Sequence, residues 1–120
     1  MNTITELTIT RHNWLRGEED SYLLRMLDQK MCCLGHFSLA CGAKREHLVD
    51  RTTPYRLTEK FGDSACPIQI YQPEPFDTTN LIHRIMETND EKAYTDDQRE
   101  VKLKELFLQL NPPVVLTFVD

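Results

Sequence analysis

Val114-Val115-Leu116-Thr117-Phe118-Val119 is apolar at every position but one. A short apolar run rich in β-branched and aromatic residues predicts a strand. Since both of its sides are apolar, we expect this strand to be buried on both faces or central in its sheet. Residues 3–10 (TITELTIT) are also rich in β-branched residues and predict a second strand. The simplest arrangement places the N- and C-terminal strands together in one small sheet.

Two helices are predicted immediately before the last strand. The first carries one apolar stripe, and Asp77 or Thr78 can cap its N-terminus; the stripe is Leu81, Ile82, Ile85 and Met86. The second begins with the capping-box pattern of Thr95 and Gln98 and ends before Pro112. Its apolar face comprises Leu103, Leu106, Phe107 and Leu110.

Short helices are predicted in the first half of the chain. Residues 33–41 place Leu34, Phe37 and Cys41 on one helical face, and Gly42 supplies a stop signal. A further short helix is expected over residues 44–49. The fold class is therefore α+β: a small sheet that includes both terminal strands, packed by about four helices in a single domain over residues 1–120.

Three segments are less regular. Residues 11–20 are polar and predict a loop, in which Trp14 and Leu15 should point inward. Residues 22–27 and 30–33 flank Asp28-Gln29 and are compatible with either a hairpin or a broken helix. Prolines at 54, 67, 73 and 75 exclude a long helix over residues 51–77, where residues 67–71 suggest a short edge strand.

The charge is distributed unevenly. The chain of 120 residues has a formal net charge of −5, and its first half holds nine lysines and arginines against eight acids. The second half holds five against eleven. This balance disfavours nucleic acid and favours a protein with a basic surface as partner. We expect no membrane contact, because no apolar run approaches the ~20 residues that span a bilayer. The N-terminal residues do not resemble a secretory signal, so we expect a cytoplasmic protein with reduced thiols.

The cysteines invite two chemical hypotheses. Cys32, Cys33, His36 and Cys41 contain zinc-type ligands, but their spacing matches no zinc motif, and free cysteines are commonly buried hydrophobes. We therefore expect no metal and no cofactor. A cysteine nucleophile would use Cys32, Cys33 or Cys66 with His36, His47 or His83. No orienting group or oxyanion hole accompanies them, so a binding protein is favoured over an enzyme.

A small-ligand site is the alternative to a protein-binding function. Basic residues of the first half could form one face, on which Arg16, Gly17 and Arg25 would lie near a phosphate group. Such a module would be a nucleotide sponge or a nucleotide-modifying enzyme, although no phosphate-binding glycine motif is present.

Acidic residues of the second half are the candidate partner-binding residues. They are Glu87, Asp90, Glu91, Asp96, Asp97 and Glu100. The competing interpretation is an ordinary solvent-facing helix surface, in which Lys92, Arg99, Lys102 and Lys104 alternate with the acids.

The sequence also resembles a group of small proteins common in tailed-bacteriophage genomes. The segments that carry this resemblance are 14–18 (WLRGE), 30–35 (KMCCLG), 40–42 (ACG) and the ending of the chain. His36 departs from it, because an aromatic residue is expected there. The resemblance implies a viral accessory role in the host cytoplasm and no particular chemistry. Together with the acidic second half, it suggests a protein that binds and inhibits a bacterial protein, such as a CRISPR or restriction component.

Overall fold

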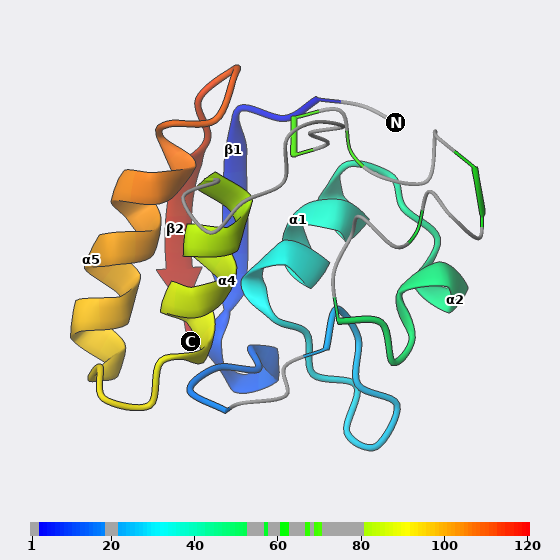
Figure 1. The fold of residues 1–120 in the computed structure, drawn as a ribbon, viewed down its shortest axis with the longest axis horizontal. Helices are drawn as coiled ribbons and strands as arrows, with labels where there is room; N and C mark the ends of the chain where they lie inside the picture. The colour runs from blue at the N-terminus through cyan, green and yellow to red at the C-terminus, as the bar shows by residue number, and fades with distance from the viewer. Residues whose placement is uncertain are drawn as a thin grey trace.

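Two parallel strands from opposite ends of the sequence lie side by side (Figure 1). This computed structural model describes residues 3–18, 22–52, 57, 61–62, 67, 69–70 and 81–120. β1 spans Glu6–Thr10 and β2 spans Val115–Val119, in a register that pairs Glu6 with Val115 and Thr10 with Val119. The α+β fold class and the pairing of the terminal strands are thus confirmed.

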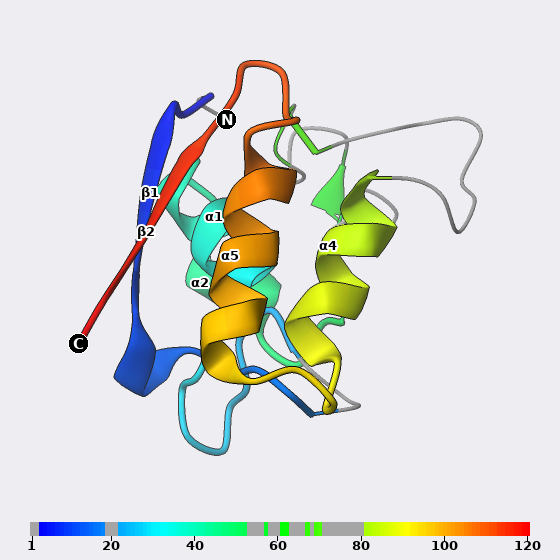
Figure 2. The ribbon, with the colours of Figure 1, turned by 90° about the vertical axis from the view of Figure 1, so that its left-hand side faces the viewer.

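Within the described part of the chain, the helices cover one face of the sheet. Figure 2 shows the strands on one side of the molecule and the helices on the other. Leu116 and Phe118 are buried beneath the helices, whereas Val115 and Val119 are 57% and 40% exposed. The prediction that β2 is buried on both faces or central in its sheet is therefore wrong, because its outer face is exposed and its described partner is β1 alone. An apolar run does not reveal how many layers will cover it, and here the described helices supply one layer.

Four α-helices and one 3-10 turn accompany the sheet in the described residues: η1 (Arg11–Asn13), α1 (Cys33–Ala40), α2 (Arg45–Leu48), α4 (Leu81–Asp90) and α5 (Asp96–Phe107). Within them, α1 packs against β1, and α5 packs against both β2 and α4. None of these helices is long and apolar enough to cross a bilayer. The cap expected at Asp77 or Thr78 lies outside the described residues.

Glycines determine how α1 is placed. Gly35 lies against the backbone of Leu23, where a Cβ atom would collide with the carbonyl oxygen. Gly42 follows the helix with φ +102°, a conformation that favours glycine and ends the helix. The predicted start of α1 is confirmed, and the helix ends one residue before the predicted Cys41; its close approach to Leu23 explains why a glycine occurs inside the helix.

α5 begins as its sequence predicts. The Gln98 N–H donates to Thr95 Oγ1 at 3.2 Å, and the Thr95 N–H donates to Gln98 Oε1 at 2.9 Å, which completes a capping box. Leu103, Leu106 and Phe107 are buried on its inner face.

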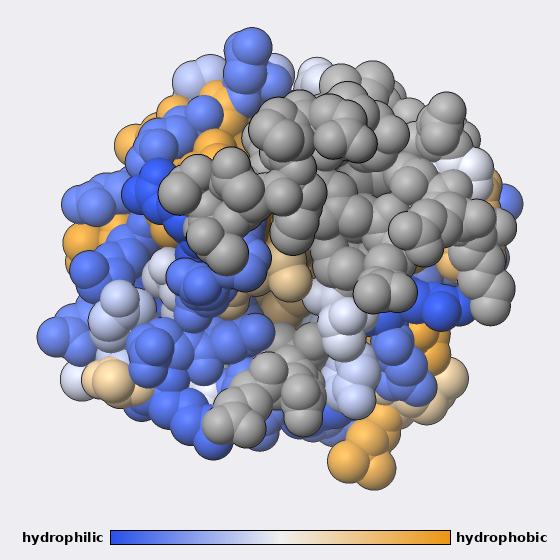
Figure 3. Space-filling model, viewed as in Figure 1, coloured by the Kyte–Doolittle hydropathy of each residue, from blue (hydrophilic) through white to orange (hydrophobic). Residues whose placement is uncertain are grey.

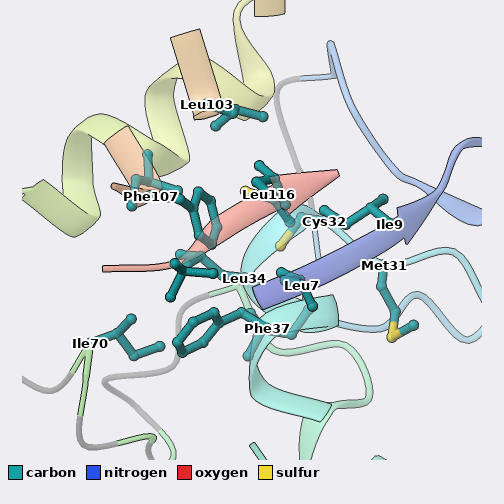
Figure 4. Close-up of a cluster of buried hydrophobic side chains, with 14 of the residues drawn as sticks. Leu7, Ile9, Met31, Cys32, Leu34, Phe37, Ile70, Leu103, Phe107 and Leu116 are labelled. Atoms are coloured by element: carbon teal, nitrogen blue, oxygen red, sulfur yellow. The ribbon is translucent and has the colours of Figure 1, made fainter. Parts of the chain in front are cut away.

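The hydrophobic core joins the sheet to α1 and α5. Figure 4 shows Cys32 and Leu34 from the start of α1 among Ile9, Leu116 and Phe107. The described buried apolar residues other than Leu15 form one cluster, to which Cys33 and Cys41 also belong. Cys32, Cys33 and Cys41, the described cysteines, therefore contribute to the interior, as predicted.

Two irregular segments contain no regular strand or helix in their described residues. Residues 22–32 come nearer to the hairpin alternative than to a broken helix, because their two arms are hydrogen-bonded across a turn: the Arg25 N–H donates to the Lys30 carbonyl at 2.8 Å, and the Cys32 N–H donates to the Tyr22 carbonyl at 3.0 Å. In the proposed edge strand at residues 67–71, Gln69 and Ile70 occupy a turn. The Gln69 side chain instead satisfies both backbone groups of Ile4, at 2.8 and 2.9 Å, and so replaces a strand partner.

Candidate functional site

The segment Trp14–Gly17 is bound to the end of α4 through Asn89. The Trp14 indole N–H donates to Asn89 Oδ1 at 2.9 Å, and Asn89 Nδ2 donates to the Leu15 carbonyl at 3.0 Å. The Gly17 N–H donates to the Asn89 carbonyl at 2.9 Å. Asn89 Oδ1 also accepts from the Cys33 N–H at 3.2 Å, at the start of α1. A single buried amide thus fixes two distant segments to α4.

Arg99 completes this junction from α5. Its side chain is 3% exposed, and its guanidinium donates to the carbonyls of Thr88, Glu91 and Tyr94 at 2.7 to 3.2 Å. A Cβ atom on Gly17 would lie 3.1 Å from Arg99 Nη2, so the glycine leaves room for the guanidinium. The turn between α4 and α5 is therefore held from within by a cation.

A second irregular element, the turn from Arg25 to Lys30, borders the same region. Asp28 accepts two hydrogen bonds from the Arg25 guanidinium, at 3.1 and 2.6 Å, and one from the Lys30 N–H at 3.1 Å. Gln29 adopts φ +62°. The tip of this turn projects at the lower right in Figure 1, with Leu27 89% exposed.

These elements surround a cavity of about 290 Å³, which we call the basic pocket. Its charged lining residues are Arg16, Glu18, Arg25, Lys30, Asp96 and Arg99, and Gly17 also borders it. The structure therefore brings together Arg16, Gly17 and Arg25, the three residues selected from the sequence as a possible ligand site.

The arginines of the basic pocket are held by internal partners. Arg16 donates to Asp96 at 2.9 Å and lies over the Trp14 ring, 4.7 Å from its centroid. Arg25 also donates to Glu18 at 2.8 Å. The hydrogen bonds from Arg25 lower the pKa of Asp28 to about 2, and Arg16 likewise lowers the pKa of Asp96. Their guanidinium groups are thus fixed before any ligand arrives.

A second cavity, of about 590 Å³, lies beside α4. We call it the acidic hollow; it is lined by His83, Met86, Glu87, Asp90, Glu91 and Lys92. Three of the predicted partner-binding acids therefore share one concave surface. On the face seen in Figure 3, the surface over α4 and α5 is largely hydrophilic, with isolated apolar patches.

The remaining predicted acids divide into different environments. Asp97 is exposed on the first turn of α5, whereas Asp96 pairs with Arg16. Glu100 does not belong to an exposed acidic band, because its side chain is 11% exposed and both carboxylate oxygens accept from Arg11 at 2.9 Å. Glu100 as a partner-binding residue is therefore corrected to an internal ion-pair residue.

The potential nucleophiles and bases near α1 are withdrawn from solvent. Burial raises the pKa of Cys32 to about 12 and that of Cys41 to about 11, and it raises the pKa of Cys33 well above its usual value. Burial lowers the pKa of His36 to about 4. These thiols stay protonated and this imidazole stays neutral at physiological pH. Cys66 lies outside the described residues.

Two residues of the junction were missed by sequence reasoning. Arg99 was interpreted as a solvent-facing cation, although it lies four residues before Leu103 and so shares the buried stripe of α5. That periodicity could have revealed it. Asn89 carries no comparable signal, because its partners at residues 14–17 and 33 are distant in sequence.

Comparison with known proteins adds no further constraint. No family model, no curated protein and no solved structure matches the chain. Any function must therefore be argued from the cavities of the described residues and the side chains around them.

Proposed function

We propose that this chain is an accessory protein of a tailed bacteriophage that binds and inhibits a protein of the bacterial host, in the host cytoplasm. A component of a CRISPR or restriction system is the target class we favour. The observation that carries the proposal is the acidic hollow, which concentrates Glu87, Asp90 and Glu91 on one concave surface.

The chemistry of this surface suits a basic partner. Glu87 is 65% exposed, and Glu91 is also exposed, so both carboxylates can meet arginine or lysine side chains. Met86 adds apolar area to the hollow, against which the stem of a long cationic side chain can lie. Asp97, exposed on the next helix, extends the negative potential beyond the hollow.

An inhibitor of this kind works by occlusion rather than by chemistry. A stable complex buries about 800 Å² on each partner, so the surface must extend beyond the hollow over neighbouring parts of α4 and α5. Electrostatic attraction would speed the encounter with a basic host protein and would weaken as salt is raised. The described thiols near α1 are buried in the core, which suits a role in packing rather than in chemistry.

The test compares the capture of a host protein by the unmodified chain and by charge-reversed variants. The double variant Glu87→Lys/Glu91→Lys reverses two negative charges of the hollow, whereas Glu6→Lys/Glu46→Lys reverses two exposed acids on β1 and α2, away from α4 and α5. We expect a host protein captured by the unmodified chain to be lost with the first variant and retained with the second. Raising the salt should release it.

A biological readout completes this test. Expression of the chain should increase the plating efficiency of a phage that the host restricts, and the hollow variant should lose this effect. A partner that binds equally well to the hollow variant, or the absence of protection by a chain that is folded and expressed, would contradict the proposal.

A further inference from the structure

We propose that the basic pocket binds the phosphate group of a small phosphorylated molecule, up to the size of a nucleoside monophosphate. The site is separate from the acidic hollow and does not depend on the host-protein proposal. The proposal rests on the charge of the lining, on the fixed geometry of its arginines, and on the volume of the pocket.

The sign of the charge is the first argument. The described lining contains four cations, Arg16, Arg25, Lys30 and Arg99, against two carboxylates, those of Glu18 and Asp96. The lining is therefore positive, although the whole chain has a formal net charge of −5. A concave positive site on an acidic protein concentrates small anions and focuses the field within the cavity.

The second argument is the fixed position of the arginines. Arg16 donates to the carbonyls of Arg11 and Trp14 at 3.0 Å as well as to Asp96. Arg25 is held by two carboxylates, and Arg99 by three backbone carbonyls. Their side-chain entropy is lost on folding, so a ligand meets cations that are already ordered.

Two cations that line the basic pocket have hydrogen-bonding capacity that no described partner uses. Arg99 Nε is buried without a hydrogen-bond partner in the described part of the chain, and it lies 3.9 Å from Asp96 Oδ1. Lys30 lines the pocket and forms no ion pair with a described carboxylate. An ammonium group on a flexible stem can close over an anion that enters beside the fixed guanidinium groups. Lys30 is therefore the cation most available to the ligand.

The size of the pocket limits the ligand. Its volume of about 290 Å³ lies near the lower end of ligand sites. Gly17, at φ +68°, contributes no side chain to the wall and faces the Arg99 guanidinium. A phosphate group with a small organic substituent fits this space, whereas a nucleic acid backbone is disfavoured by the acidic α4 and α5 surface.

The test is NMR titration of the ¹⁵N-labelled full chain at low ionic strength. The probes are inorganic phosphate, a nucleoside monophosphate and the corresponding nucleoside. We expect both phosphate-bearing probes to shift the amide signals of Gly17, Arg25 and Lys30, and the nucleoside to leave them unchanged. Tighter binding of the monophosphate identifies an organic phosphate as the ligand, and equal binding identifies phosphate itself.

Two lysine variants make the test specific. Lys30→Ala should weaken phosphate binding about tenfold or more, because a charge-assisted hydrogen bond is lost. Lys104→Ala, on the exposed side of α5, should leave the affinity unchanged. The proposal is overturned by a folded chain whose pocket signals do not move, by equal weakening in both variants, or by equal binding of the nucleoside. The host-capture experiment gives a separate readout, so one proposal can fail while the other stands.

Discussion

The segment Trp14–Gly17 and the turn from Arg25 to Lys30 both lack regular structure and both border the basic pocket, but they are held in different ways. The first depends on Asn89, more than seventy residues away, and its tryptophan is 1% exposed. The second is closed mainly by its own residues, Asp28 above all, with exposed side-chain bonds from Arg25 to Glu18 and from Arg45 to Gln29, and it carries the exposed Leu27. Long-range bonds make one wall of the pocket part of the core, and local bonds leave the other wall at the surface.

This difference predicts that substitutions in the two segments change global stability by different amounts. Changes near the first segment should lower the free energy of unfolding, because they break contacts between distant elements. Changes in the turn should leave global stability nearly intact but make local opening of the turn more frequent. The following predictions, in order of decreasing effect, test that separation.

The largest effect is expected where α1 approaches the backbone that leads into the turn. Gly35→Ala places a methyl group against the Leu23 carbonyl, and backbone cannot move aside as a side chain end can. We expect the free energy of unfolding in urea to fall by about 3 kcal/mol. The matched control Gly42→Ala meets no atom within 4 Å and should lose only about 1–2 kcal/mol from its positive φ. Equal losses would contradict the close approach of α1 to Leu23.

The next effect concerns Asn89. Asn89→Ala leaves the Trp14 indole N–H, the Cys33 N–H and the Leu15 carbonyl without their partner. Buried groups that lose hydrogen bonds destabilise, and we expect a loss of about 2 kcal/mol in urea unfolding. Glu87→Gln, on the exposed side of the same helix, should change stability by less than about 0.5 kcal/mol. An Asn89 variant as stable as this control would show that the segment is held by something else.

Acid sensitivity should come from His36. Burial lowers the pKa of His36 to about 4 from 6.5, so below pH 6.5 the unfolded chain binds the proton while the native state does not. Stability is therefore complete above pH 6.5 and falls as the pH drops toward 4. We expect a loss on the order of 1–2 kcal/mol over this range, reduced in His36→Gln.

The pH window separates this effect from that of the carboxylates. The pKa of Asp28 is lowered to about 2, so its contribution is lost only at lower pH. Urea unfolding at several pH values between neutrality and pH 4 provides the measurement. An unchanged pH dependence in His36→Gln would show that His36 is not the group that titrates.

The smallest effect on stability is expected from the turn itself. Asp28→Asn weakens the pairing with Arg25 while leaving the core untouched. The thermal midpoint should stay close to that of the unmodified chain, while hydrogen exchange at the Lys30 amide becomes faster, because its acceptor is Asp28 Oδ1. A large drop in the midpoint would mean that the turn is part of the core, and the contrast between the two segments would fail.

The same contrast explains what the sequence could predict. Helix periodicity, the Thr95 capping box and the Gly42 stop are local signals, and the elements they predict occur in the structure. Arg16, Gly17 and Arg25 were selected for their chemistry, and folding brings them to one pocket. The role of Asn89 could not be predicted, because its hydrogen bonds join segments far apart in sequence.

Two errors have the same origin. The apolar residues of β2 indicate a strand, yet the exposure of Val115 depends on how many layers cover the sheet. Glu100 looks like a surface acid until Arg11, on the other side of the sequence, pairs with it. Both outcomes are set by tertiary packing, which no local pattern of residues encodes.

Thiol reactivity tests the central claim that the cysteines near α1 belong to the interior of the protein. In a Cys66→Ser variant, the remaining cysteines are Cys32, Cys33 and Cys41, all buried in the core. When native protein is mixed with a chromogenic disulfide reagent, the thiols should react only as fast as the native structure opens to expose them. In denaturant all three thiols should react at once. Immediate reaction of any one of them in the folded protein would place a reactive cysteine at the surface and contradict the account.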